Sequence, residues 1–326
     1  MIIPTFSDIE AAADVLAPHN VETPLVENAE LNARLGGRLF LKLETLQRTG
    51  SFKFRGAMNR ISRIPSQDRA RGVVAFSSGN HAQGVAAAAA LLGIPALIVM
   101  PKDAPRTKVQ GTRARGAEVV FYDRQTDDRE AIALRICEER GATLIRPFDD
   151  PYIVAGQGTI GLEIARAAAA RGVQLDAVLA PCSGGGLVSG IALAFATQSP
   201  STGVGSVEPE NFDGMRRSLV QRRRVAAPGG RPSVADALMA PTPGEVPFAI
   251  AQCHLRFALA VRDEDMTSAA AEALSSLKIL VEPSGAAALA AALTTKFPVS
   301  GKNVAVVLSG ANCDVAPATT ANTQAT

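Results

Sequence analysis

Residues 72–100 read GVVAFSSGNHAQGVAAAAALLGIPALIVM and contain the pattern that decides the fold. Two short apolar runs, 72–76 and 96–100, flank an alanine-rich segment and a break formed by Gly93 and Pro95. A short apolar run bounded by glycine is typical of a strand buried on both faces, and the alanine-rich segment is typical of a buried helix. The stretch therefore predicts strand, helix and parallel strand, with a polar loop after the first strand.

The same alternation continues outward along the chain. Apolar runs of the strand type occupy residues 72–76, 96–100, 117–121, 177–180, 203–207 and 304–308. Segments with helical periodicity occupy 82–92, 106–115, 129–140, 157–171, 186–196, 267–277 and 285–296, and a further helical stretch occupies 55–61. Strands and helices in alternation predict an α/β protein with open parallel sheets.

Length and composition restrict the class of protein. The 326 residues are 47% hydrophobic and 20% charged, which predicts a folded soluble chain of one large or two ordinary domains. A net charge of +2 argues against nucleic acid as the main partner. Gly93 and Pro95 interrupt the uncharged run at 84–101, so we expect no membrane span.

The amino terminus and the cysteines bear on location and metal content. The first residues have no basic start followed by an apolar core, so we expect no signal peptide and a cytoplasmic protein. Four cysteines and three histidines are scattered without a Cys-x-x-Cys motif, which fits a reducing compartment and predicts no zinc site. The residues from about 316 to 326 are expected to form a frayed tail.

Small and polar residues follow four of the predicted strands, at 77–81, 181–186, 208–209 and 309–312. The carboxyl ends of parallel strands are where ligands bind in open α/β sheets. We therefore expect these four loops to share one pocket.

The loop at 183–187, Ser-Gly-Gly-Gly-Leu, is the most informative of the four. Three glycines before a helix allow several backbone N–H groups to point at one anion, which favours a phosphate cradle. Two other interpretations remain at this point. The loop could be a tight turn without a ligand, or Gly184-x-Gly186 with Glu208 about 20 residues later could be a degenerate dinucleotide motif.

Three further segments are candidates that have plain structural alternatives. Lys53 precedes a helical stretch next to Arg55, where an amine is pushed toward its neutral, nucleophilic form, although most lysines are surface charges. Ser78 or Asn80 could bind a carboxylate or could simply cap a helix. Ser309, at the end of a buried strand, could bind a ligand or satisfy the backbone.

Five motifs in order resemble the pyridoxal-phosphate enzymes of the threonine dehydratase and serine racemase group, which have the tryptophan synthase β-like fold (fold type II). The motifs are Ser51-Phe52-Lys53-x-Arg55-Gly56, Ser77-Ser78-Gly79-Asn80-His81-Ala82-Gln83-Gly84, Gly156-Gln157-Gly158-Thr159, Ser183-Gly184-Gly185-Gly186-Leu187 and Leu308-Ser309-Gly310. The resemblance extends from about residue 23 to 309, and five ordered motifs are far more specific than one. It weakens the structural alternatives and the dinucleotide interpretation together.

The resemblance implies a role for each matching residue. Lys53 matches the lysine that holds pyridoxal 5'-phosphate covalently and removes the Cα proton, and Phe52 packs near the ring. Asn80 matches the group that hydrogen-bonds the ring hydroxyl, and Ser309 faces the ring nitrogen. Ser78 matches the second proton carrier of the racemases. The phosphate cradle matches Ser183, Gly184, Gly185, Gly186 and Leu187, and the clamp on the substrate carboxylate matches Ser77, Ser78, Gly79, Asn80 and His81.

The implied reaction is the dehydration and deamination of a β-hydroxy amino acid to a 2-oxo acid and ammonia. Serine racemisation is the first alternative. Narrower dehydratases, for 3-hydroxyaspartate, phenylserine or hydroxyectoine breakdown, are others, because Val234-Ala-Asp-Ala and Arg146-Pro-Phe-Asp-Asp depart from the usual pattern. Cysteine synthases share the fold but usually carry different loops. A cofactor-storing protein would not need both Lys53 and Ser78.

A cation site and the domain organisation complete the expectations. The group often holds a cation through E-x-x-x-x-x-D, but Gly214 stands six residues after Glu208, so we predict no metal. We expect a small domain at 71–148 and a large domain formed by 1–70 and 149–326, with the cofactor between them. The resemblance also implies a homodimer.

Overall fold

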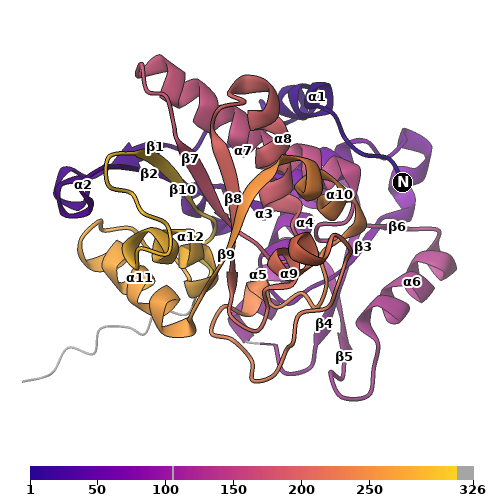
Figure 1. The fold of residues 1–326 in the computed structure, drawn as a ribbon. Helices are drawn as coiled ribbons and strands as arrows, with labels where there is room; N and C mark the ends of the chain where they lie inside the picture. The colour runs from indigo at the N-terminus through magenta and orange to yellow at the C-terminus, as the bar shows by residue number, and fades with distance from the viewer. Residues whose placement is uncertain (105, 314–326) are drawn as a thin grey trace, which may run out of the picture.

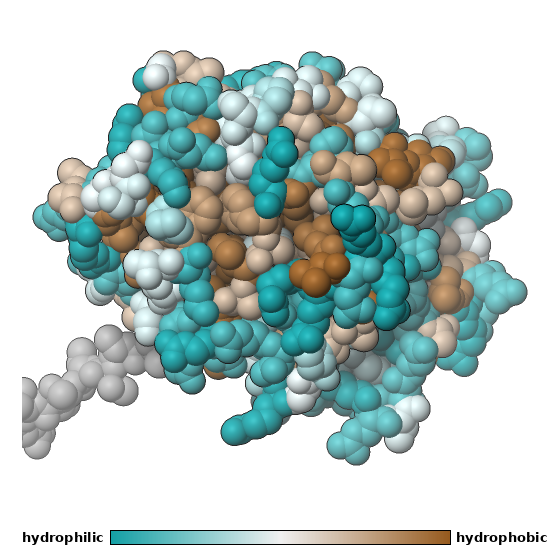
Figure 2. All heavy atoms as spheres, viewed as in Figure 1, coloured by the Kyte–Doolittle hydropathy of each residue, from teal (hydrophilic) through white to brown (hydrophobic). Residues whose placement is uncertain are grey.

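The structure is a computed structural model that describes residues 1–104 and 106–313. Two separate sheets organise the chain (Figure 1). No helix in these described ranges is long and apolar enough to cross a membrane. On the face drawn in Figure 2, hydrophilic side chains surround scattered hydrophobic groups. The expected tail at 316–326 lies outside the described residues.

The larger sheet has six strands in the order β1-β2-β10-β7-β8-β9. Its members are β1 (Leu25–Glu27), β2 (Arg38–Leu43), β7 (Ala177–Pro181), β8 (Gly203–Pro209), β9 (Leu255–Val261) and β10 (Asn303–Leu308). All neighbours pair in parallel except β1, which is antiparallel to β2. β10, the last strand in the part of the chain that the structure describes, is therefore inserted between β2 and β7, which joins the amino-terminal part to the rest of the sheet.

Helices cover both faces of this sheet. The helices are α1 (Phe6–Leu16), α2 (Ala29–Leu35), α7 (Pro151–Ala170), α8 (Gly186–Gln198), α9 (Gly214–Gln221), α10 (Glu245–His254), α11 (Asp263–Ser275) and α12 (Pro283–Leu293). Alternate residues of β10 face opposite sides: Val304 and Val306 pack in the cluster that contains α11 and α12, whereas Ala305 packs with α7 and α8. This two-sided burial explains why the strand is apolar throughout.

The smaller sheet has four parallel strands in the order β5-β4-β3-β6. They are β3 (Val73–Phe76), β4 (Ala96–Pro101), β5 (Glu118–Tyr122) and β6 (Thr143–Leu144). The helices around it are α3 (Lys53–Ser62), α4 (Asn80–Leu91), α5 (Arg106–Arg113) and α6 (Arg129–Arg140). Residues of α3 and α4 pack together on one face of this sheet, and residues of α6 pack on the other. The core under the smaller sheet thus includes side chains from 54–64.

The expected mixed α/β fold with parallel sheets is confirmed, and each predicted strand is present. The apolar runs and helical periodicities of the sequence did not reveal eight of the observed elements, which are β1, β2, β6, β9, α1, α2, α9 and α10. They also placed the start of α7 at 157, whereas the helix begins at Pro151 because the Asp150 carboxylate accepts from the N–H groups of Tyr152 and Ile153. Short 3-10 helices lie at Glu44–Leu46, Arg48–Gly50, Ser66–Arg71 and Asp236–Leu238.

Candidate active site

One cavity of about 330 Å³ gathers the loops that follow strands of both sheets. Every site residue expected from the sequence lines it: Phe52, Lys53, Ser77, Ser78, Gly79, Asn80, His81, Ser183, Gly184, Gly185, Gly186, Leu187 and Ser309. Parallel strands direct their carboxyl ends to one edge, and this places segments as distant in sequence as 77–81 and Ser309 around the same space. Three of the four loops expected to share a pocket therefore do so, through 77–81, 181–186 and Ser309, whereas the loop at 208–209 does not line the cavity.

The glycine loop at 183–186 leads from β7 into the amino terminus of α8. A Cβ on Gly184 would lie 2.3 Å from the Phe148 ring, so the ring and this backbone are in direct contact. Gly185 has a φ of +95° and its carbonyl receives the Ser189 N–H, so it begins the helix in a conformation that favours glycine. The first N–H groups of an α-helix have no carbonyl partner within the helix, and at α8 the residues that carry them, Gly186 and Leu187, line the cavity.

Lys53 stands at the start of α3, at the boundary of the two sheets. Its Nζ donates to the Pro147 carbonyl oxygen at 2.7 Å and lies 5.1 Å from the centre of the Phe52 ring. Burial of the ammonium lowers the pKa of Lys53 to about 8. No carboxylate is paired with it among the described residues, so the neutral amine is far more populated near neutral pH than for an ordinary lysine.

The loop at 77–81 connects β3 to α4. The Gly79 N–H donates to Ser77 Oγ at 3.2 Å, which tightens the turn. His81 is buried, and its Nε2 donates to the Ile145 carbonyl oxygen at 2.9 Å. Burial, and secondly the charge of Lys53, lower the pKa of His81 to about 3. This imidazole is therefore neutral and offers no positive charge to a substrate carboxylate.

The segment that carries Phe52 and Lys53 is attached to the end of β10. The Phe52 N–H donates to the Ser309 carbonyl oxygen at 3.1 Å, and Ser51 pairs with Gly310 as an isolated antiparallel bridge. The Ser309 hydroxyl is only slightly exposed and makes no hydrogen bond within residues 1–104 and 106–313. A buried hydroxyl without a partner at a cavity wall is suited to a ligand atom.

The sequence reasoning did not single out several polar residues that also line the cavity. These are Lys108, Arg124, Arg129, Asp236, Glu282 and Ser284. The departure at Val234-Ala-Asp-Ala was a signal for Asp236, which pairs with Lys108 at 3.0 Å. Lys108 is on α5 and Arg129 is on α6, and neither position differs from an ordinary surface charge in the sequence.

The motif at 156–159 does not line the cavity but holds α3 against α7. A Cβ on Gly156 would lie 2.7 Å from the Gly56 Cα, so the two helices touch at paired glycines. Next to this contact, the Arg55 guanidinium donates to Glu44 at 2.8 Å and to Glu163 at 2.6 Å. Lys42 pairs with Glu163 at 2.5 Å. The motif therefore fixes the position of α3, the helix that begins at Lys53.

The Glu208 carboxylate is hydrogen-bonded to backbone groups of the protein itself. Its two carboxylate oxygens accept the N–H groups of Met215 and Arg216, each at 2.8 Å, at the start of α9. Asp213 pairs with Arg216 and Arg217. No cluster of three or more metal-ligating side chains occurs in the described part of the chain. The dinucleotide interpretation loses its acid, and the absence of a metal stays a prediction.

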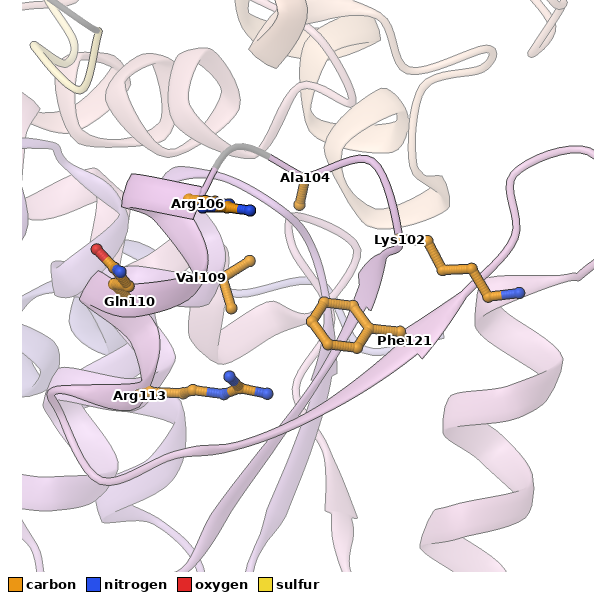
Figure 3. Close-up of a pocket in the computed structure, with 7 residues that line it drawn as sticks. All are labelled: Lys102, Ala104, Arg106, Val109, Gln110, Arg113 and Phe121. Carbon is orange, nitrogen blue, oxygen red and sulfur yellow. The ribbon is translucent and has the colours of Figure 1, made fainter.

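A second cavity of about 350 Å³ lies on the smaller sheet, between α5 and β5 (Figure 3). Its polar lining comes from Lys102, Arg106, Gln110 and Arg113, over Val109 and Phe121. Arg113 lies 5.7 Å from the centre of the Phe121 ring. This cavity shares no residue with the first one.

Comparison with known proteins agrees with this arrangement. The sequence profile of the family described as "Pyridoxal-phosphate dependent enzyme" matches residues 16–310. An L-threonine ammonia-lyase of Thermotoga maritima is 42% identical, over 95% of this chain and 76% of its own. An L-threo-3-hydroxyaspartate ammonia-lyase of Saccharomyces cerevisiae is 39% identical, over 97% and 95%. The solved structure of maize serine racemase is similar with a TM-score of 0.91 at 34% identity, over 96% and 95%.

Proposed function

The chain belongs to the pyridoxal-phosphate-dependent enzymes, and we propose that it is an ammonia-lyase for a β-hydroxy amino acid. The net reaction converts R–CH(OH)–CH(NH₃⁺)–COO⁻ into R–CH₂–CO–COO⁻ and NH₄⁺. Water is lost from Cα and Cβ and is taken up again when the amine leaves as ammonia, so atoms balance. The single observation that carries the proposal is the gathering of Lys53, Asn80, the glycine loop and Ser309 around one cavity.

The residues present fit the cofactor. The glycine loop and the amino terminus of α8 offer backbone N–H donors for a phosphate. The Lys53 amine has a lowered pKa and no acidic partner within the described ranges, as attachment to an aldehyde requires. The unpaired Ser309 hydroxyl is suited to a ring nitrogen. When bound, pyridoxal phosphate would supply a sink for the electron pair that the Cα proton leaves behind.

The protein's own groups would then do the following. Lys53, as a neutral amine, accepts the Cα proton, and the Pro147 carbonyl oxygen orients its Nζ. The loop at 77–81 holds the substrate carboxylate through hydroxyls and backbone N–H groups rather than through a cation, because His81 is neutral. Ser309, as a neutral hydroxyl, does not hold the ring nitrogen protonated as a carboxylate would.

Racemisation is the alternative that uses the same residues. Ser78 is the candidate for a second proton carrier, and it lines the cavity together with Lys53. A racemase returns a proton to Cα, whereas a lyase loses the Cβ hydroxyl. Incubation with L-serine, followed by chiral analysis and ammonia detection, separates the two. D-Serine formed faster than ammonia would refute the lyase proposal.

The first test of the proposal uses the purified protein and its Lys53→Ala variant, with Lys102→Ala as a matched surface control. We expect a visible absorption band from lysine-bound cofactor in the unmodified protein and in the control, and none in Lys53→Ala. We also expect ammonia and a 2-oxo acid from at least one β-hydroxy amino acid. A protein that shows no band even with added cofactor would refute the proposal.

A specific observation favours a substrate with a second carboxylate. Lys108, Arg124 and Arg129 all line the cavity. Asp236 accepts from Lys108, and Asp103 accepts from Arg124 at 2.9 Å, but Arg129 has no acidic partner in the described residues and stacks over Phe76 at 5.5 Å. A guanidinium with free donors beside the substrate space is suited to a carboxylate. 3-Hydroxyaspartate is therefore the second candidate substrate.

The second candidate is tested by Arg129→Met, with Arg124→Met as the control. If Arg129 pairs with the distal carboxylate, kcat/KM for L-threo-3-hydroxyaspartate should fall about 10- to 100-fold, since a hydrogen bond to a charged group contributes about 1.5–3 kcal/mol. The value for L-threonine should change less than about threefold. Equal losses on both substrates would contradict this assignment.

The proposal also includes three expectations about domain movement, cellular location and oligomeric state. We propose that 71–148 moves relative to the rest of the chain and closes on the substrate. We also propose a cytoplasmic location, which fits scattered cysteines in a reducing compartment, and a homodimer, as the family resemblance implies. Sedimentation as a monomer at micromolar concentration would refute the last of these.

A further inference from the structure

A network of hydrogen bonds holds the Asn80 side chain in place, and the proposed reaction gives no role to the other residues of this network. Its Nδ2 donates to Glu282 Oε1 at 2.5 Å, and its Oδ1 accepts from Asn312 Nδ2 at 2.7 Å. Asn312 Nδ2 also donates to the Thr49 carbonyl oxygen at 2.7 Å. Glu282 immediately precedes α12 without a side-chain capping hydrogen bond, and its own N–H donates to the Gly310 carbonyl oxygen at 3.0 Å. The four groups come from four separate segments of the chain.

The donors and acceptors of this network can be arranged in only one way. The Thr49 carbonyl can only accept, so it requires the NH₂ group of Asn312 on its side. That NH₂ group in turn requires the amide oxygen of Asn80. The NH₂ group of Asn80 is left to face the Glu282 carboxylate, which accepts it. If the Asn80 amide were rotated by half a turn, its NH₂ group would face the NH₂ group of Asn312, and its oxygen would face the Glu282 carboxylate. Neither contact could be a hydrogen bond.

The local packing leaves these side chains little freedom. A Cβ on Gly310 would lie 2.6 Å from Glu282 Oε1 and 3.0 Å from Asn80 Nδ2, so both groups lie directly on the backbone. Thr49 has a φ of +66°, unusual for threonine, and Gly50 follows with +70°; this turn presents the Thr49 carbonyl to Asn312. Asn80 and Glu282 are buried, and both line the cavity.

We propose that Glu282 and Asn312 are positioning residues of the cofactor site, which fix the Asn80 amide so that its second N–H is free to donate to the cofactor's ring hydroxyl oxygen. The proposal rests on the proposed function, because it requires that the cofactor binds next to Asn80. An amide NH₂ group has two hydrogens, and Glu282 takes one of them. A donor at an ionised ring oxygen favours the ionised form and so lowers the pKa of that oxygen.

The test uses Asn312→Ala and Asn312→Asp, with Asn303→Ala as the matched control. Asn303 Nδ2 also donates to a backbone carbonyl, that of Gln174, at 2.9 Å, but far from the cavity. Two properties of the whole protein are measured: the dissociation constant of pyridoxal phosphate from the apo form, and the pH at which the visible spectrum of the bound cofactor changes. Neither measurement depends on turnover.

The variants should separate positioning from general structure. Asn312→Ala should weaken cofactor binding about threefold to tenfold, because a neutral hydrogen bond contributes about 0.5–1.5 kcal/mol. Asn312→Asp should weaken it more, since a carboxylate opposes both the Thr49 carbonyl and the Asn80 oxygen, and it should raise the spectral transition pH. Asn303→Ala should change neither. Glu282→Gln, which keeps an acceptor for Asn80, should retain more affinity than Glu282→Leu.

Two results would overturn the inference, and they can be told apart. If Asn312→Ala and Asn312→Asp bind the cofactor as the control does, with an unchanged spectral transition, then Asn80 needs no positioning and only this inference fails. If the unmodified protein binds no cofactor, the proposed function fails together with it. Equal loss of affinity in Glu282→Gln and Glu282→Leu would remove Glu282 from the proposal.

Discussion

Replacement of Arg55 by methionine tests the buried ion cluster behind Lys53. The Arg55 side chain is 0% exposed and donates two hydrogen bonds to Glu44, both at 2.8 Å, and two to Glu163, at 2.6 and 2.9 Å. Lys42 is the other cation in the cluster, so two cations balance two carboxylates. Without Arg55, the fully buried Glu44 and the 13%-exposed Glu163 would share one ammonium.

The magnitude follows from this loss of balance. Removal of one partner of a buried ion pair costs about 3–5 kcal/mol, because the remaining charge is left without its counter-charge in a poorly solvated site. We therefore expect Arg55→Met to lower the free energy of unfolding in urea by about that amount. Arg55→Lys should recover only part of it, since one ammonium cannot bridge two carboxylates as a planar guanidinium does.

The control is an exposed pair with the same two-bond geometry. Arg140 donates to both oxygens of Glu118, but the two side chains are 50% and 52% exposed. Arg140→Met should cost less than about 1 kcal/mol. Adding Glu44→Gln to Arg55→Met should restore stability, because Lys42 and Glu163 then form a neutral pair. Unfolding free energies of Arg55→Met and Arg140→Met that agree within 1 kcal/mol would refute the reasoning.

Three further predictions concern the cavity. Gly185→Ala should weaken cofactor binding at least about tenfold more than Gly93→Ala. Both glycines have positive φ, but an added methyl group meets the Met215 and Pro247 side chains only at Gly185. Titration of the apo form with pyridoxal phosphate checks this, and equal affinities of the two variants would contradict it. A chelator should leave ammonia release unchanged, since backbone N–H groups occupy both Glu208 oxygens; activity lost and then restored by Mg²⁺ or Ca²⁺ would show a cation site. The rate at which the apo form captures pyridoxal phosphate should rise with pH through the Lys53 pKa of about 8 and level off once most of the amine is neutral; a rise that continues to pH 10 would contradict the lowered pKa.

Local patterns were sufficient for the fold class and for much of the cavity. The strands at 73–76 and 303–308 are apolar because each is covered on both faces, so burial leaves its mark in a few adjacent letters. The three glycines at 184–186 are recognisable for a similar reason. Their backbone touches Phe148 and begins α8, and only glycine fits such contacts. Each of these features is written in adjacent residues, so it can be recognised locally even where the contacting residue, such as Phe148, is distant in sequence.

Other parts of the site depend on partners that are distant in sequence. β2 escaped recognition because Arg38 and Lys42 interrupt its apolar run, and Lys42 is buried only because Glu163 of α7 neutralises it. Arg129 has no special sequence signal, yet the fold places it at the cavity.

The same division separates what the sequence determined from what the tertiary structure decided. The sequence determined the helix and strand layers and the edge of the sheets where a ligand binds, through its alternation of apolar runs and glycine loops. This alternation is a local pattern, because each helix or strand restricts the residue types within its own segment. The orientation of Asn80 was decided only when β10 was inserted between β2 and β7, because Glu282 and Asn312 are 202 and 232 residues away from it. A polar side chain acquires its role from the partner that the fold brings to it, and no local pattern records that partner.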